Sequence, residues 1–94
     1  MGNMLNLYTA FDVQMELTEF ISQSRKLKKY SVEELSTRSG VPYGTIRKFE
    51  TTGNISLRQF LMLYEVVADL KKVHALTKPE SIEPSSIEQV LKNA

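Results

Sequence analysis

The chain has 94 residues, which predicts a single domain with a short arm or tail and leaves no room for a second core. Its composition, 41% hydrophobic and 24% charged with a net charge of +1, is typical of an ordinary globular protein and not of a disordered or fibrous one. The lack of cysteine excludes a disulfide framework and a thiolate metal site, and with no apolar run of roughly 18 residues it favours a cytoplasmic protein without a membrane partner.

The charges are segregated along the chain. Residues 1–24 carry three carboxylates and no Lys or Arg, whereas residues 25–48 carry seven cations against two carboxylates, a local charge of +5. A basic segment of this kind is typical of a surface that binds a polyanion, although it is more often an ordinary solvated face. The spacing of the residues must therefore distinguish the two interpretations.

The first predicted helix covers residues 12–28 and follows an N-terminal arm of residues 1–11. Apolar side chains recur in it at steps of three and four residues, which places them on one stripe of a helix. These side chains are Val13, Leu17, Phe20, Ile21 and Leu27.

The second helix is predicted over residues 31–39. Ser31 is a strong cap, because its hydroxyl can accept from the backbone three residues on while Glu34 reaches back to complete a capping box. Gly40 supplies the left-handed conformation that ends a helix.

A third short helix is expected from Pro42 to about residue 50. Proline suits a first helical position, where its missing N–H costs nothing. Ile46 and Phe49, three residues apart, are expected to point inward, and the weak helix former Gly44 indicates either close approach to another backbone or fraying.

Ser56 and Gln59 repeat the capping box and open a fourth helix that is apolar nearly all round, so it should form the buried centre. Residues 69–76 continue as a short fifth helix or an extension of the fourth. The tail, residues 77–94, combines a Pro- and Ser-containing linker with a possible short helix. The fold class is therefore all-α: a compact bundle of about five short helices over residues 12–76, followed by a tail.

Two short helices joined by a tight glycine-containing turn, the second bearing exposed cations, allow one helix to enter the major groove of DNA while the other rests on the backbone. Side chains that face a groove about 12 Å wide must be polar, small or cationic. Tyr43, Gly44, Arg47 and Lys48 meet this description. The spacing thus predicts a helix-turn-helix.

The stretch SVEELSTRSGVPYGTIRKFETTGNISLRQF, residues 31 to 60, resembles the Cro/CI-type helix-turn-helix regulators, the XRE family. With the flanking helices the resemblance covers roughly residues 13 to 75. The chain departs from the family pattern at Val32, where a glutamine is usual, at Ser36, where an alanine is usual, and at Pro42, which replaces the usual serine cap.

The resemblance implies that Tyr43, Gly44 and Lys48 point at base edges, with Thr45 and Arg47 flanking them. Lys48 can donate to guanine, and Arg47 can contact either guanine or phosphate. Tyr43 can pack against a thymine methyl or donate to a phosphate, and Gly44 brings the backbone close. Phosphate contacts, which position the protein without specifying sequence, are expected from residues at helix ends and loops: Lys26, Lys28, Lys29, Ser31, Arg38, Thr45, Thr51, Thr52 and Asn54.

One recognition helix reads only a few base pairs, so the expected unit is a homodimer that acts as a repressor on a palindromic operator in double-stranded DNA. The candidate dimer or partner surface consists of Tyr64, Val67, Leu70, Ile87, Val90 and Leu91. Small chains of this type are also similar to autoregulating antitoxins of toxin-antitoxin systems. The alternative function is accordingly a protein-interaction module that neutralises a toxin, such as a HipA-type kinase, with DNA binding secondary.

No catalytic constellation is recognisable in the sequence. His74 is the single histidine and has no cysteine or serine partners, and the chain lacks a glycine-rich phosphate loop. Asp12, Glu16 and Glu19 share a helix face, which solvent exposure explains more simply than a paired-carboxylate site. We therefore expect no enzyme activity, no metal and no cofactor.

Overall fold

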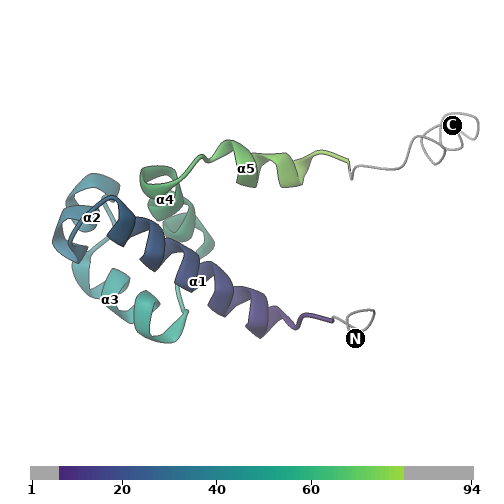
Figure 1. The fold of residues 1–94 in the computed structure, drawn as a ribbon, viewed down its shortest axis with the longest axis horizontal. Coiled ribbons are helices and arrows are strands. Elements are labelled where there is room, and N and C mark those ends of the chain that lie inside the picture. The colour runs from purple at the N-terminus through teal and green to yellow at the C-terminus, as the bar shows by residue number, and fades with distance from the viewer. Residues whose placement is uncertain (1–6, 80–94) are drawn as a thin grey trace, which may run out of the picture.

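The computed structural model describes residues 7–79, which form the helices of an all-α domain (Figure 1). The elements are α1 (Ala10–Leu27), α2 (Val32–Ser39), α3 (Tyr43–Thr52), α4 (Leu57–Val67), α5 (Lys71–His74) and the 3₁₀ turn η2 (Ala75–Thr77). The predicted fold class is thus confirmed. The expected tail helix, with Ile87, Val90 and Leu91, lies outside the described residues.

The first helix begins at Ala10, two residues before the predicted start. Thr9 caps it, because its hydroxyl accepts from the Asp12 N–H at 3.0 Å while the Asp12 carboxylate accepts from the Thr9 N–H at 3.1 Å. This reciprocal box satisfies two N–H groups that the helix itself leaves without partners. The arm assigned to residues 1–11 therefore ends earlier than predicted.

The cap of α2 is confirmed only in part. Ser31 Oγ accepts from the Glu34 N–H at 3.0 Å, as predicted. The Glu34 carboxylate does not reach back to the cap, because it accepts instead from Arg38 Nε at 2.7 Å, one helical turn further on. Gly40 ends the helix in the left-handed conformation, with φ of 83°, as expected.

The structure corrects the position of Pro42. It lies at the N-cap of α3 with extended backbone, φ −59° and ψ 146°, and its carbonyl accepts from the N–H groups of Thr45 and Ile46. The first helical residue is therefore Tyr43. The ψ of 146° lies outside the helical region, so Pro42 contributes only its carbonyl to the helix and closes the three-residue turn between α2 and α3.

The second half of the domain consists of α4 and a separate short helix after it. Ser56 caps α4 by accepting from the Gln59 N–H at 3.1 Å, and its hydroxyl donates to the Gln59 side chain at 3.2 Å. At Ala68 the backbone becomes fully extended, so α5 is a separate helix of 4 residues followed by η2. Of the two alternatives predicted for residues 69–76, the short separate helix is therefore confirmed, and an extension of the fourth helix is wrong.

The core is built from α1 to α4 and the turn before α3. Its buried apolar side chains are Ile21, Leu35, Val41, Ile46, Phe49, Leu63, Tyr64 and Val67. Tyr64 and Val67 are only 7% and 6% exposed, so they offer little side-chain surface to a partner, whereas Leu70 is exposed. The dimer surface itself stays a prediction. The helices of the described part are too short or too polar to cross a membrane.

Candidate nucleic-acid interface

The α2–turn–α3 segment is held rigid from the inside. Ile46 and Phe49 of α3 are buried, as predicted, and so is Val41 in the turn. The turn is fixed further by the Ser36 hydroxyl, which donates to the Val41 carbonyl at 2.7 Å, and by the Val41 N–H, which donates to Ser39 Oγ at 3.1 Å. One face of α3 is consequently fixed in the core and the other is left outward.

An ion pair that the sequence analysis did not anticipate ties α3 to α1. The Arg25 guanidinium donates to both carboxylate oxygens of Glu50, at 2.8 and 3.0 Å, and also to the Tyr30 carbonyl at 2.8 Å. The two side chains are only 12% and 14% exposed. Because Glu50 is the one carboxylate of α3, this pair removes the negative charge from the helix surface. The available signal was the position of Glu50, four residues after buried Ile46 and hence near the inward face.

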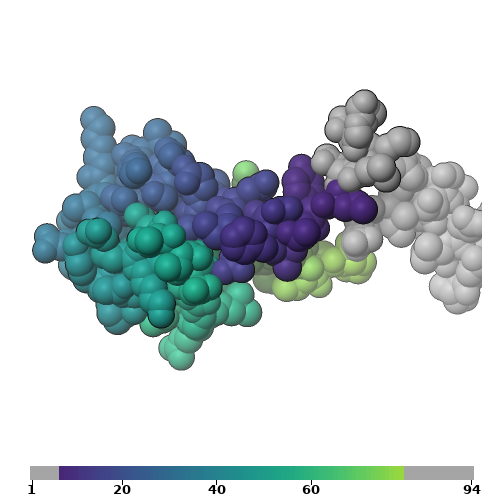
Figure 2. Space-filling model, turned by 90° about the horizontal axis from the view of Figure 1, so that it is seen from below, coloured from purple at the N-terminus to yellow at the C-terminus, as the bar shows by residue number. Residues whose placement is uncertain are grey.

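The outer face of α3 combines the four residues predicted to contact bases. Tyr43, Gly44, Arg47 and Lys48 are all exposed, and Figure 2 shows the α3 segment, in teal, open at the surface of the molecule. Arg47 donates to the Tyr43 hydroxyl at 3.1 Å, and its guanidinium lies 5.9 Å from the centre of the tyrosine ring. These two residues thus support each other one helical turn apart.

Gly44 forms the open part of this face. A Cβ atom added there would meet nothing within 4 Å, and the residue has no left-handed backbone that would require glycine. The expected close approach to another backbone is therefore not made within the described chain. The smooth surface beside Lys48 leaves room for an external ligand to approach the helix.

Two of the predicted phosphate donors are already occupied. The hydroxyls of Thr51 and Thr52 donate to the carbonyls of Arg47 and Lys48, at 2.8 and 2.7 Å, so neither hydrogen is free for a phosphate oxygen. A threonine in a helix commonly bonds to the carbonyl one turn back. The contact of these two residues with phosphate stays a prediction. Thr45, also predicted, is half-buried.

The remaining predicted phosphate contacts lie in exposed positions on several elements. No ion pair within residues 7–79 involves Lys26, near the end of α1, or Lys28 and Lys29, which follow that helix. The Ser31 hydroxyl serves as the α2 cap. Arg38 is engaged within the domain, where it pairs with Glu34 and stacks over the Tyr30 ring at 4.4 Å.

Asn54 follows the end of α3 and is also exposed. Its side-chain oxygen accepts from Gln14 of α1 at 3.3 Å, and its backbone N–H donates to Thr52 Oγ1 at 3.1 Å. No described contact joins Asn54 or the lysines of α1 to Tyr43, Arg47 or Lys48. The structure therefore unites the base-contact candidates on one helix and leaves the phosphate candidates distributed around it.

No family model matches the chain, and no curated protein or solved structure matches it either. Within residues 7–79, no cluster of three or more His, Cys, Asp or Glu side chains is placed to hold a metal ion.

Proposed function

We propose that the chain is a sequence-specific DNA-binding regulator in which α3 enters the major groove. The observation that carries the proposal is the composition of the outer face of α3, where Arg47, Lys48, Tyr43 and Gly44 are exposed and the single carboxylate of the helix is neutralised from behind by Arg25. A helix about 10 to 12 Å in diameter fits a major groove about 12 Å wide.

The roles of the side chains follow from their hydrogen-bonding groups. Lys48 and Arg47 can donate to the O6 and N7 acceptors of guanine, and the Tyr43 ring can contact a thymine methyl. The bond between Arg47 and Tyr43 limits the freedom of the guanidinium before binding, so less side-chain entropy is lost on contact with DNA. Lys26, Lys28 and Lys29 supply additional positive charge for phosphates.

A short recognition helix reads few base pairs, so we propose that two copies bind a palindromic operator with half-sites about 34 Å apart. Repression follows as the regulatory outcome if the operator overlaps a promoter. The antitoxin assignment and the alternative of a toxin-binding module stay predictions, because no contact within residues 7–79 favours a particular protein partner.

The test is selection of bound duplexes from a random DNA pool by the full chain, repeated at two salt concentrations. We expect a palindromic motif to be enriched, with affinity falling as salt rises because phosphate contacts release counterions. Lys48→Ala should weaken or change the motif. The matched control Lys71→Ala, which removes an exposed lysine of α5 away from α3 (Figure 1), should affect it far less. Recovery of random sequences only, or of no DNA, would contradict the proposal.

A further inference from the structure

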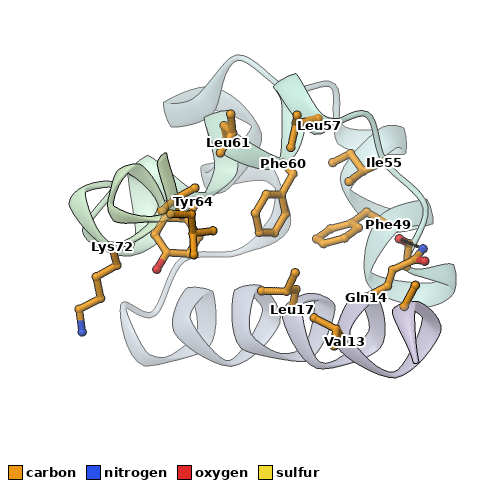
Figure 3. Close-up of a pocket in the computed structure, with 14 residues that line it drawn as sticks. Val13, Gln14, Leu17, Phe49, Ile55, Leu57, Phe60, Leu61, Tyr64 and Lys72 are labelled. Carbon is orange, nitrogen blue, oxygen red and sulfur yellow. Dashed lines mark hydrogen bonds between the residues drawn. The ribbon is translucent and has the colours of Figure 1, made fainter. Parts of the chain in front are cut away.

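An apolar groove of about 670 Å³ lies between the N-terminal half of α1, the α4 helix and the α5–η2 segment (Figure 3). Val13 and Leu17 form the lip on α1, Phe60 and Leu61 line the α4 side, and Phe49 contributes the floor. The volume falls in the range of about 300 to 1,000 Å³ that encloses a drug-sized ligand, so several aliphatic side chains can enter it.

The lips of the groove are apolar and exposed to a degree that a free surface does not normally tolerate. Leu57 and Leu76 are 73% and 81% exposed, and Val13 and Leu17 of the stripe expected to be buried are still more than one third exposed. A contiguous patch of this kind usually marks an interaction site. The groove therefore requires an occupant.

The polar groups of the groove indicate the chemistry of that occupant. The Gln14 amide is already used, since it donates to the Gly53 carbonyl at 2.6 Å and to Asn54 at 3.3 Å. Tyr64 and Lys72 both lie at the opposite end of the groove (Figure 3). A small polar ligand needs several converging polar groups to be oriented. The mostly apolar lining with one lysine at its end instead suits an occupant that has an aliphatic surface and one acidic side chain at its edge.

We propose that the chain's own residues 86–92 occupy this groove as a short amphipathic helix, with Ile87, Val90 and Leu91 inserted. These three residues follow the i, i+3, i+4 spacing that forms one apolar face. Eight or fewer residues cannot hold a helix in water, so such a segment needs a docking surface. The inference concerns a different surface from α3 and does not depend on DNA binding.

The position of the last described residue supports this occupant. The described chain ends at Pro79, three residues after Leu76, which itself lines the groove. From Pro79 to Ser86 the chain takes seven residue steps, which span up to about 25 Å when extended and are enough to turn back into the groove. Because the segment is tethered so close to the groove, its effective concentration there is high, and a free partner must compete with it for the groove.

Charge complementarity supports the same occupant. Residues 80–94 carry three glutamates and one lysine, a charge of −2, whereas residues 69–79 carry three lysines and one aspartate, a charge of +2. On the helix proposed here, Glu88 lies next to the apolar face, on the flank of Leu91. The exposed amine of Lys72 at the groove is therefore the matching partner for Glu88.

The test uses the absence of cysteine from the chain, which allows a single spin label at Asn93→Cys of the full-length protein. We expect the label to broaden the methyl NMR signals of groove residues such as Val13, Leu17 and Leu61 more than those of Leu35 in α2. Val90→Asp should abolish this selective broadening. Gln89→Asp, which adds the same charge to the opposite side of the helix, should preserve it.

A mixed sample separates docking within one chain from docking between two copies. When spin-labelled chains without isotope are mixed with isotope-labelled chains without the spin label, we expect no broadening of groove signals. Broadening in the mixed sample would mean that the groove takes the segment of a second copy and would overturn the proposal. Equal broadening of groove and α2 signals in the first experiment would overturn it as well.

Discussion

The outer face of α3 and the groove between α1, α4 and α5 are both open to solvent, but their chemistry is opposite. The α3 face presents Arg47, Lys48 and the Tyr43 hydroxyl, all of which are well hydrated in the free protein. The groove presents leucine and valine side chains, whose exposure costs about 25 cal/mol for every Å² of apolar surface. Apolar exposure favours the proposed cover of the groove in the free protein, whereas the α3 face can stay open until a charged partner binds.

The two surfaces share one core residue. Phe49 lies on the inner side of α3 and also forms the floor of the groove, where its ring packs edge-on against Phe60 with centroids 6.2 Å apart. The α3 helix is thus held by the same packing that shapes the groove. Substitutions that damage this packing should affect both surfaces, and those confined to one face should separate them.

The largest effect is expected for Phe49→Ala, which should lower the free energy of unfolding by about 3 to 5 kcal/mol by emptying a core position. Phe49 is 2% exposed and contacts Phe60, so the cavity cannot be filled by solvent-facing side chains. Urea denaturation measures the loss. The matched control Leu27→Ala, at a position 82% exposed and outside the groove, should change stability by no more than about 0.5 kcal/mol.

The second effect concerns the ion pair behind α3. Arg25→Ala should destabilise the domain by about 2 to 3 kcal/mol, because it leaves the Glu50 carboxylate and the Tyr30 carbonyl without their donor in a site that is mostly buried. Thermal or urea denaturation of this variant and of Lys26→Ala, its exposed neighbour, provides the comparison. Equal stability of the two variants would mean that the pair does not anchor α3.

The helix caps and the Arg25–Glu50 ion pair show why the sequence predicts some parts of the molecule and not others. The caps at Ser31 and Ser56 and the helix end at Gly40 depend on residues within four positions of each other, and all three are found in the structure. The bond between Arg25 and Glu50 joins residues 25 positions apart, and only the folded arrangement brings them together. A pattern of charges along the chain assigned Arg25 to a basic segment and could not identify its partner.

The candidate sites follow the same distinction. Outward positions on α3 repeat with the helical period. The exposure of Tyr43, Arg47 and Lys48 could therefore be inferred from the predicted burial of Ile46 and Phe49 on the other face of the helix. The burial of Tyr64 and Val67 could not, because α4 is apolar on several sides and the neighbouring helices decide which side is covered. The groove could not be predicted from the sequence either. It forms because α5 is a short separate helix that leaves α1 partly uncovered.

The third prediction tests the α3 face without disturbing the core. Lys48→Ala should weaken binding to the selected operator by about 1 to 3 kcal/mol, roughly 5- to 150-fold, with an unchanged melting temperature because the side chain is exposed. Fluorescence anisotropy with a labelled duplex measures the affinity. Lys71→Ala should lose far less operator affinity. A similar loss of affinity in both variants would mean that Lys48 acts only through its positive charge and not through a base contact.

The smallest of the four expected effects, and the one that most sharply separates folding from binding, is a gain of stability in Gly44→Ala. The added methyl group meets nothing within 4 Å and replaces glycine in a helix, so the free energy of unfolding should rise by about 0.5 to 1 kcal/mol. Operator affinity should fall, because the methyl group projects from the surface that approaches the bases. Gly53→Ala is the contrasting control: its backbone is left-handed and the new Cβ would lie 2.7 Å from the Met15 sulfur, so it should lose stability. A more stable Gly44→Ala variant with full affinity would show that DNA does not approach this part of α3.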